Sequence, residues 1–345
     1  MSHEIDLSKY EIRTDLAIES IEENENIEGI KSVVEKVGDI KITNVVVDKK
    51  GSSVINKKIG MYITIEFDDV TDKDNKEKVI EVFSFYFNRM LRELNLTDNK
   101  SCMIIGLGNS SSTPDALGPL VVEDIVVTKH LFELGCVGKG FRNVCAINPG
   151  VMGKTGIETS NMVKSIVESE KPDFLIVVDA LASKSLDRVN KTIQMSDAGI
   201  NPGSGIGNNR KEISKEVLGI PVIAIGVPTV VDAVTIVSDT INFMHKHYSY
   251  MKKNINNPVN RLIPLSSINY LKEKIEIEEN DKTKLLGYIG SLNDKEIRAL
   301  IYEVLSPIGY NMIVTPKEVD FVMKKLSEII SKGINKTLHE SMNNT

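Results

Sequence analysis

Hydrophobic and polar residues alternate in two early stretches of the chain. Residues Ile40 to Val47 (IKITNVVV) and Met61 to Phe67 (MYITIEF) are rich in β-branched residues with a period of two, which is typical of strands with one covered face. Lys49 to Ser52 form a turn signal between them. The pattern therefore predicts an antiparallel strand pair. Residues 1–35 are charged and weakly periodic, and we do not expect them to contribute to the core.

The middle of the chain changes to continuous apolar runs separated by helical patterns. Runs of this kind are typical of strands covered on both faces. The runs are Cys102 to Leu107, Val144 to Ile147, Phe174 to Val178 and Val222 to Ile225, and the helical patterns are Gly118 to Leu134, Ile157 to Glu168 and Thr229 to His245. This order predicts an α/β fold, with a mainly parallel twisted sheet and helices on both faces. Functional residues of such sheets collect at the carboxyl ends of the strands.

The last third of the chain begins with a polar stretch and ends with helices. We expect a flexible excursion at about residues 250–284, because the stretch is rich in Asn and charge. A helix is predicted from Asp294 to Leu305. Thr315 and Glu318 have the spacing of a capping box, which predicts that a further helix opens at Thr315. The fold should therefore close with a helical C-terminal segment.

Composition narrows the class of protein. The chain has 345 residues, 42 Lys plus Arg against 48 Asp plus Glu, a net charge of −6 and 41% hydrophobic residues, which excludes disordered and fibrous proteins. The slight acidity gives no reason to expect direct nucleic-acid binding. No stretch reaches the roughly 20 apolar residues of a membrane span, and the beginning, MSHEIDLSKY, is unlike a secretory signal. We expect a cytoplasmic protein with no membrane partner.

Cysteine and histidine give little support for a metal site. The three cysteines, at positions 102, 136 and 145, have no CxxC spacing, so neither a disulfide framework nor a zinc site is indicated. His245 and His247 form a close pair, which we interpret as the solvated end of a helix in preference to a metal site. We therefore expect no metal and no cofactor.

Glycine-rich segments match the known phosphate-binding motifs only in part. Gly106-Leu107-Gly108 lacks the third glycine and the downstream acid of a dinucleotide fingerprint. Gly153-Lys154-Thr155 resembles the end of a P-loop, but Asn148 stands where the first glycine belongs. No helix clearly begins behind Pro202 to Gly207 (PGSGIG), and we interpret this segment as a mobile loop near the cleft.

Two predicted strand ends carry an aspartate. The glycine-rich exit Gly106 to Pro119 (GLGNSSSTPDALGP) contains Asp115, and the run Phe174 to Val178 ends directly in Asp179. An isolated buried carboxylate is costly, so the two could face each other across one cleft. There, repulsion and burial favour one protonated and one ionised carboxyl group, which could donate a proton and activate water. The residues equally allow Asp115 to cap the next helix and Asp179 to cap a turn.

Four segments together resemble the germination protease family of endospore-forming bacteria. They are Thr113 to Pro119 (TPDALGP), Val178 to Ala182 (VDALA), Ile225 to Ala233 (IGVPTVVDA) and Val314 to Asp320 (VTPKEVD). The resemblance spans nearly the whole chain. It implies an aspartic endopeptidase with a fold similar to that of the hydrogenase maturation proteases, and it assigns the catalytic aspartates to Asp115 and Asp179. Five neighbours are expected to support the cleft: Gly108, Asn109, Thr113, Pro114 and Pro228.

The resemblance also implies a self-processing precursor. Members of the family remove a short leader after an acid that is followed by an apolar residue and Ala, and Arg13 to Ala17 (RTDLA) fits this pattern. Cleavage is thus implied between Asp15 and Leu16, with residues 1–15 as propeptide and 16–345 as a single catalytic unit. Our hypothesis is that the propeptide covers the cleft or holds a loop, helped by its high local concentration.

The implied substrates are the small acid-soluble proteins that coat spore DNA, degraded during germination in the cytoplasm of the forespore and spore core. The implied assembly is a homotetramer. Two alternatives stay open. One is a metal-dependent, nickel-sensing maturation-type protease, in which acids and a His would bind the ion. The other is a non-catalytic scaffold or nucleotide-binding protein whose aspartates cap helices.

Overall fold

The computed structural model describes residues 14–22, 27–203, 211–254, 275, 277, 279–305 and 312–344. The chain divides into two compact units. Of the described residues, those within 14–230 and 315–344 belong to the larger unit, and those within 231–314 belong to the smaller unit. Most of the propeptide, most of the Pro202 to Gly207 loop and most of the predicted excursion lie outside the described residues.

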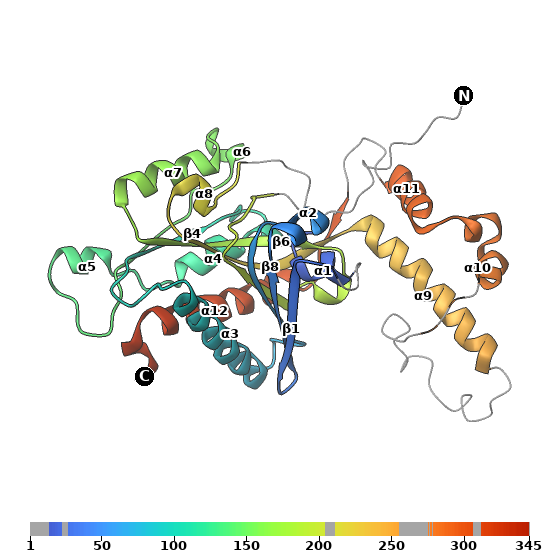
Figure 1. Cartoon of the computed structure of the whole chain (residues 1–345), viewed down its shortest axis with the longest axis horizontal. Helices are drawn as coiled ribbons and strands as arrows, with labels where there is room; N and C mark the ends of the chain where they lie inside the picture. Colours follow the sequence, from blue (N-terminus) through green and yellow to red (C-terminus); the bar gives the residue numbers. More distant parts are fainter. Residues whose placement is uncertain are drawn as a thin grey trace. The chain divides into compact units, whose positions relative to one another are not determined.

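The larger unit is built on a twisted, mixed β-sheet (Figure 1). Its strands are β1 (Ile30–Val37), β2 (Ile40–Val47), β3 (Gly60–Glu66), β4 (Cys102–Gly106), β5 (Val144–Ile147), β6 (Phe174–Ser183), β7 (Thr192–Ser196) and β8 (Val222–Asp232). They lie in the order β1-β2-β3-β7-β8-β6-β4-β5. β4 pairs in parallel with β5 and β6, whereas β1, β2, β3, β7 and β8 pair antiparallel in turn.

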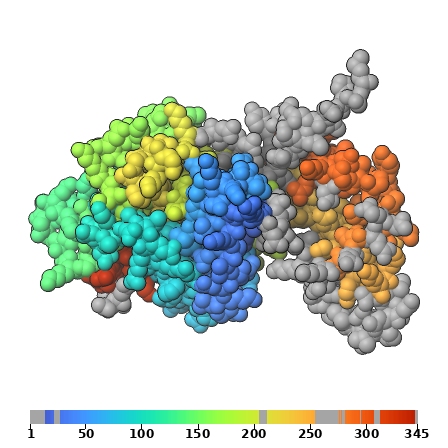
Figure 2. Space-filling view, in the orientation of Figure 1, coloured from blue at the N-terminus to red at the C-terminus, as the bar shows by residue number. Residues whose placement is uncertain are grey.

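The α/β prediction and the antiparallel pair β2–β3 are confirmed, but the sheet has a larger antiparallel part than predicted. Two strands account for the difference. β1 (IKSVVEKV) is an edge strand whose Val33 and Val34 are more than half exposed, so it shows no alternation of polar and apolar residues. β7 (TIQMS) is short and polar at alternate positions. Figure 2 shows the N-terminal strands, in blue, at the molecular surface.

Helices cover both faces of this sheet, as predicted (Figure 1). The helices of the larger unit are α1 (Ala17–Glu22), α2 (Lys49–Ile55), α3 (Lys73–Glu93), α4 (Leu117–Glu123), α5 (Lys129–Glu133), α6 (Met152–Thr155), α7 (Thr159–Glu170), α8 (Lys215–Leu218) and α12 (Val319–Leu338). α3, α4 and α12 pack on one face, and α7 packs on the other. Burial of these two apolar layers is the main force that holds the unit together.

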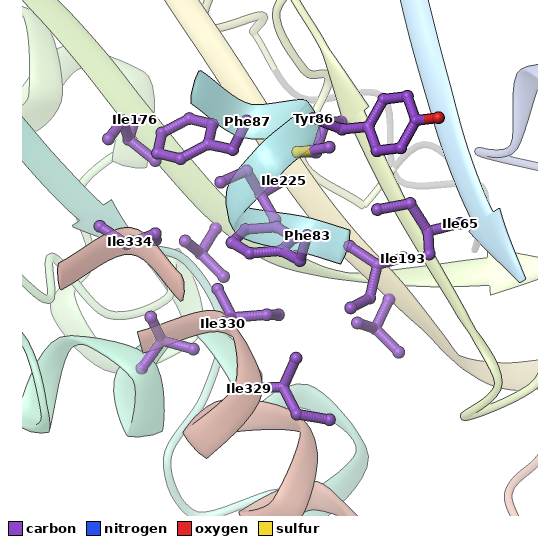
Figure 3. Packing of buried hydrophobic residues seen from close by; sticks show 14 of the residues in the cluster. Ile65, Phe83, Tyr86, Phe87, Ile176, Ile193, Ile225, Ile329, Ile330 and Ile334 are labelled. Carbon is purple, nitrogen blue, oxygen red and sulfur yellow. The ribbon is translucent and has the colours of Figure 1, made fainter. Parts of the chain in front are cut away.

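The first core layer is densest where α3 meets α12. Phe83 and Phe87 of α3 stack with ring centroids 5.8 Å apart, among Ile residues from the sheet and α12 (Figure 3). Gly333 of α12 lets the two helices approach closely, because a Cβ atom there would lie 2.2 Å from the Phe83 ring. The sequence pattern alone gives no sign of this close contact.

Several local predictions are wrong. Leu16 and Ala17 are fully buried, although we expected no core residues in this part of the chain. The segment predicted as a turn forms α2, capped by Asp48. α12 begins at Val319 and not at Thr315. The predicted helix from Gly118 to Leu134 is divided into α4 and α5.

The smaller unit contains three helices and one short strand in the described residues. They are α9 (Ala233–Asn254), α10 (Glu279–Leu286), α11 (Asp294–Leu305) and β9 (Ile313–Val314). β9 pairs antiparallel with Val231 and Asp232, the last two residues of β8, which belong to this unit. The Asp232 carboxylate accepts a hydrogen bond from Val234 N at the start of α9 (2.7 Å). α11 matches its prediction. His245 does not lie at a solvated helix end, because α9 continues to Asn254 and buries it.

Candidate active site

The carboxyl end of β4 lies beside the middle of β6. Gly106 is opposite Val178 in the parallel register, and Leu107 N donates a hydrogen bond to Val178 O (2.8 Å). Asp179 follows directly, with only 6% of its surface exposed. Asp179 is thus the first residue of β6 beyond the end of β4, although β6 does not end at Val178 as predicted and continues to Ser183.

The loop after β4 folds back so that Asp115 lies against the start of the loop. Gly108 has φ +115°, and a Cβ atom there would lie 2.0 Å from Asp115 O. This conformation strongly favours glycine. Asn109 N donates to Asp115 O (2.9 Å) and Asp115 N donates to Ser112 O (2.8 Å). These contacts hold Asp115 half-buried at the end of a short 3-10 helix, η2 (Thr113–Asp115).

The two aspartate-bearing segments meet at Gly118. A Cβ atom on Gly118 would lie 2.2 Å from Leu107 O and 2.6 Å from Val178 O. The first turn of α4 thus rests directly on the residue before Asp179, and η2 contacts β6. The fold therefore brings the segments of Asp115 and Asp179 together at one edge of the sheet.

The backbone positions of the two aspartates differ from those of an N-cap and of a turn residue. Ala116, and not Asp115, is the N-cap of α4, and it makes no side-chain capping bond. Asp179 lies inside β6, which continues to Ser183, so it does not begin a turn. One Asp179 carboxylate oxygen accepts from Ala180 N (2.9 Å).

Hydrogen bonds connect the loop after β4 to β8. Thr229 Oγ1 donates to Pro114 O (2.6 Å), and Thr315 Oγ1 donates to Thr229 O (2.9 Å). Pro228 O accepts from Asn190 N (2.7 Å). Pro114 and Pro228 thus belong to one connected framework around the Asp115 loop. Thr315, which we interpreted as a helix cap, is part of this framework together with Thr229.

The predicted cleavage site docks on the strand that carries Asp179. Asp15 N donates to Ala182 O (3.1 Å), and Ala182 N donates to the Asp15 carboxylate (2.9 Å). Leu16 packs in a small apolar cluster with Leu181. Because Leu181 is two residues beyond Asp179, their side chains leave the same face of β6, about 7 Å apart along the strand. The fold thus places the Asp15–Leu16 bond close to the end of β6 that holds Asp179.

Two side chains that the sequence did not point to contact the backbone around this bond. Gln194 Nε2 donates to Asp15 O (3.2 Å), and Gln194 Oε1 accepts from Ala17 N (2.8 Å). Lys57 Nζ donates to Thr14 O (2.6 Å). Burial lowers the pKa of Lys57, and the nearby carboxylates of Asp15 and Glu19 partly offset this effect.

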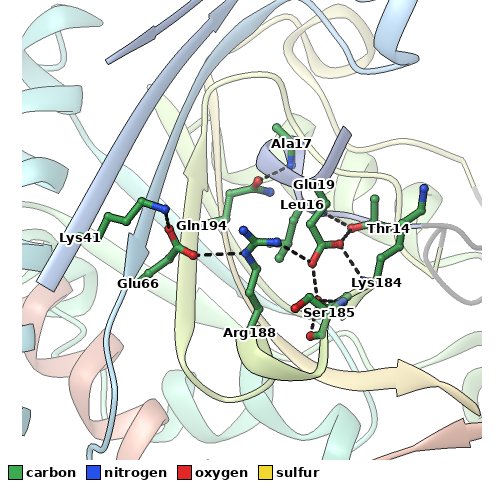
Figure 4. A network of polar contacts seen from close by, with 11 residues as sticks. Thr14, Leu16, Ala17, Glu19, Lys41, Glu66, Lys184, Ser185, Arg188 and Gln194 are labelled. Atoms are coloured by element: carbon green, nitrogen blue, oxygen red, sulfur yellow. Dashed lines mark hydrogen bonds and ion pairs between the residues drawn. The ribbon is translucent and has the colours of Figure 1, made fainter. Parts of the chain in front are cut away.

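A buried carboxylate anchors α1 next to this site (Figure 4). Glu19 is 4% exposed and accepts hydrogen bonds from Thr14 Oγ1, Ser183 Oγ and Lys184 N. Arg188 Nη1 lies 3.4 Å from the same carboxylate. Arg188 also pairs with Glu66, which pairs with Lys41. The alternating charges compensate the burial of Glu19.

The described part of the chain offers no donor set for a metal. No group of three or more His, Cys, Asp or Glu side chains in it could hold an ion. The described residues therefore do not fit the metal-dependent alternative. None of the helices in the same part of the chain combines the length and the apolar character that crossing a membrane requires.

Two comparisons at the level of sequence point to one family. A family profile described as germination protease matches residues 8–345. The germination protease of Bacillus cereus (strain AH187) is 49% identical over 357 aligned positions, covering 99% of this chain and 97% of the relative. That of Bacillus thuringiensis subsp. konkukian (strain 97-27) gives the same values. A solved hydrogenase maturation protease, HycI from Thermococcus kodakarensis, is 23% identical, covers 38% of this chain and 74% of its own, and has a TM-score of 0.25.

Proposed function

The chain belongs to the germination protease family, and from this premise we propose that it is an aspartate-dependent endopeptidase made as a self-processing precursor. Asp115 and Asp179 activate a water molecule between them. One ionised carboxylate accepts a proton from the water, and the protonated partner gives a proton to the leaving amine. Because the two acids are coupled, their roles belong to the pair and can exchange.

The observation that carries this proposal is the meeting of the two aspartate segments at Gly108 and Gly118. Contacts at Gly118 leave no room for a side chain between the start of α4 and Val178 of β6, and contacts at Gly108 leave none between the start of the loop and Asp115. Such a close backbone arrangement holds two functional groups within a narrow range of positions, which hydrolysis by a carboxyl pair requires. Asp179 also sits in a largely buried setting, where a carboxylate interacts strongly with a neighbouring acid.

The proposed first substrate is the chain itself. Residues 1–15 form the propeptide, and the Asp15–Leu16 bond is cleaved. Support comes from the docking of Asp15 on Ala182, three residues beyond Asp179. The later substrates are small acid-soluble spore proteins in the forespore and spore core, and the enzyme acts as a homotetramer. These last statements rest on the family.

Intact-mass analysis of the purified precursor over time tests the proposal. We expect loss of a fragment corresponding to residues 1–15, unaffected by chelators and by added nickel. Asp115→Asn and Asp179→Asn should each abolish the loss. Asp124→Asn, at an exposed aspartate at the end of α4, is the matched control and should process normally. Folded Asp115→Asn or Asp179→Asn variants that still process would refute the aspartate mechanism, and nickel-dependent cleavage would favour the maturation-type alternative.

A further inference from the structure

Thr14 connects the bond to be cleaved to the buried carboxylate of Glu19. Leu16 N, which is the nitrogen of the Asp15–Leu16 peptide bond, donates to Thr14 Oγ1 (3.0 Å), and Thr14 Oγ1 donates in turn to Glu19 Oε2. Figure 4 shows Thr14 and Leu16 beside Glu19. We call these two hydrogen bonds the Thr14 bridge. They join the nitrogen to a carboxylate that is only 4% exposed, through a residue of the predicted leader.

We propose that Glu19 receives the new α-ammonium group of Leu16 once the leader is removed, and that this ion pair anchors the mature N-terminus inside the larger unit. This inference rests on the proposed function, because it needs cleavage between Asp15 and Leu16. It gives the cut a second consequence. Besides freeing the leader, the cut creates the charge that Glu19 binds.

Hydrolysis changes the Leu16 nitrogen from a neutral donor to a charged one. The reaction consumes one water molecule and breaks the bond between the Asp15 carbonyl carbon and Leu16 N. The water oxygen stays on Asp15 as part of a new carboxylate, and two protons are added to Leu16 N. An α-amino group is mostly protonated at neutral pH. An N–H group with one proton thus becomes an NH₃⁺ group with three, which needs acceptors.

The new charge needs a partner at its place in the fold. Leu16 is fully buried and packs with Ile18 and Leu181. An ammonium group beside such residues is unfavourable unless a counter-charge meets it. Moving the group into water would pull the Leu16 side chain out of its apolar cluster and lose the gain from its burial. An ion pair inside the fold avoids both losses.

Departure of the leader removes one donor from the Glu19 carboxylate. Three contacts come from groups that stay in the mature protein: Ser183 Oγ, Arg188 Nη1 and Lys184 N. Thr14 Oγ1 is the contact that leaves. A buried carboxylate oxygen that has lost a donor binds a charged donor strongly. The Leu16 nitrogen loses the same hydroxyl at the other end of the Thr14 bridge, so the two groups that lose a partner are those that the bridge had joined.

Spacing along the chain lets Glu19 reach this nitrogen. Leu16 directly precedes α1, and Glu19 is the third residue of the helix. In a capping box, a Glu at this position reaches back to the backbone nitrogen of the residue before the helix. In the precursor the Thr14 hydroxyl stands between the two groups. Its loss therefore allows direct contact after a small movement of the Glu19 side chain.

The cations already near Glu19 do not take this place. Arg188 is shared, because its Nη1 lies 3.4 Å from Glu19 Oε1 and its Nε lies 3.3 Å from Glu66 Oε1. Lys57 also loses a partner with the leader, since its ammonium donates to a leader carbonyl. It competes with the Leu16 ammonium for Glu19, but Leu16 is held three residues away on the same short segment of chain.

Chemical labelling of the mature N-terminus tests the inference. The purified precursor is left to process, intact mass confirms the loss of residues 1–15, and the product is treated briefly with acetic anhydride at neutral pH. We expect the Leu16 amine to react at least about tenfold more slowly in the folded protein than in urea, because the ion pair withholds the neutral, reactive form. Glu19→Gln should remove most of this protection.

Glu66→Gln is the matched control. It removes another carboxylate that contacts Arg188, but it lies outside the Thr14 bridge, so the Leu16 amine should stay protected. Protection that survives Glu19→Gln, or that is lost equally in Glu66→Gln, would overturn the assignment to Glu19. If Lys57 took the vacated position at Glu19, the Leu16 amine of the wild-type protein would label freely, which would overturn the inference without any variant.

Thermal unfolding gives a second measurement. Glu19→Gln should lower the unfolding midpoint of the mature protein by about 2 to 4 °C more than that of a precursor kept uncut by Asp179→Asn, because only the mature protein loses the new ion pair. Equal losses in the two forms would contradict the ion pair. A leader that is removed while the Leu16 amine stays reactive overturns the inference and leaves the aspartate mechanism intact. A wild-type precursor that never loses its leader overturns both.

Discussion

Asp15 and Ala182 exchange two hydrogen bonds, from Asp15 N to Ala182 O (3.1 Å) and from Ala182 N to the Asp15 carboxylate (2.9 Å). Asp15 lies at the predicted end of the leader, and Ala182 lies on β6, the strand that carries Asp179. The contact therefore joins the part of the chain expected to be cut to the part expected to cut it.

Gly118→Ala should damage the candidate active site directly. The added methyl group would lie 2.2 to 2.6 Å from backbone atoms of Leu107 and Val178, and backbone cannot move away as a flexible side chain can. We expect a loss of about 3 kcal/mol in the free energy of unfolding and strongly reduced processing. Gly138→Ala is the control, since a methyl group there meets open space. Urea titration and intact-mass kinetics measure the two effects, and a fully active Gly118→Ala variant would contradict this account.

Glu19→Gln should destabilise the protein although it changes few atoms. The buried carboxylate accepts three hydrogen bonds and pairs with Arg188, and we expect a loss of about 1.5 to 3 kcal/mol in the free energy of unfolding. Glu81→Gln removes an exposed pair with Lys336 and should cost at most about 1 kcal/mol. Equal unfolding free energies for the two variants would mean that the Glu19 network adds no more than a surface pair.

Gly333→Ala sets two effects against each other. Alanine favours a helix by about 1 kcal/mol over glycine, but the new methyl group would lie 2.2 Å from the Phe83 ring. Phe83 is fully buried and has little freedom to move, so overpacking should dominate. We expect a net loss of about 1 to 2 kcal/mol in unfolding free energy. The control is Lys332→Ala at an exposed position of the same helix, which should change the unfolding free energy little. A stabilised Gly333→Ala variant would show that α3 and α12 can separate slightly at no cost.

His339 should make the stability of the larger unit sensitive to acid. The ring is fully buried; its Nε2 lies 3.0 Å from Val126 O, and its Nδ1 accepts from Arg142 N. Burial lowers the pKa of His339, the Val126 carbonyl partly opposes this, and Arg142 lowers it further. The ordinary pKa of histidine is 6.5. As the pH falls below this value, His339 takes up a proton in the unfolded chain before it does so in the folded protein. The contribution of neutral His339 to the free energy of unfolding is therefore complete above pH 6.5 and is lost as the pH falls below it.

The test compares unfolding free energies between pH 7.5 and 5. We expect the wild-type protein to lose stability over this range more steeply than His339→Gln, whose amide can still donate to Val126 O. Other buried histidines contribute equally to both proteins, so the difference between the two curves isolates His339. Parallel curves would contradict the assignment.

Much of the candidate site was predictable because it depends on local pattern. Phe174 to Val178 is a continuous apolar run that only a doubly covered strand explains, and the acid at its end is therefore conspicuous. The glycines around Asp115 mark a sharply folded loop. These signals needed no knowledge of distant neighbours.

The contacts around the Asp15–Leu16 bond could not be predicted, because the residues that make them are brought together by the strand register. Gln194 reaches Asp15 only because β7 is inserted between β3 and β8, and a five-residue strand with polar alternation gives a weak signal. Lys57 follows α2, whose sequence has the pattern of a turn. Leu16 and Ala17 are buried in a segment whose charge suggested exposure, because the charge of Glu19 is compensated from Arg188, far along the chain.

The two sides of the Asp15–Leu16 bond are retained by different forces. Leu16 and Ala17 are held by exclusion from water, whereas Asp15 and Thr14 are half-exposed and held mainly by polar contacts with which solvent can compete. A cut at this point would free the upstream piece to diffuse away while the downstream end stays anchored. Rejoining of the two pieces would then be opposed by dilution. A single cleavage would therefore be effectively irreversible without any rearrangement of the framework.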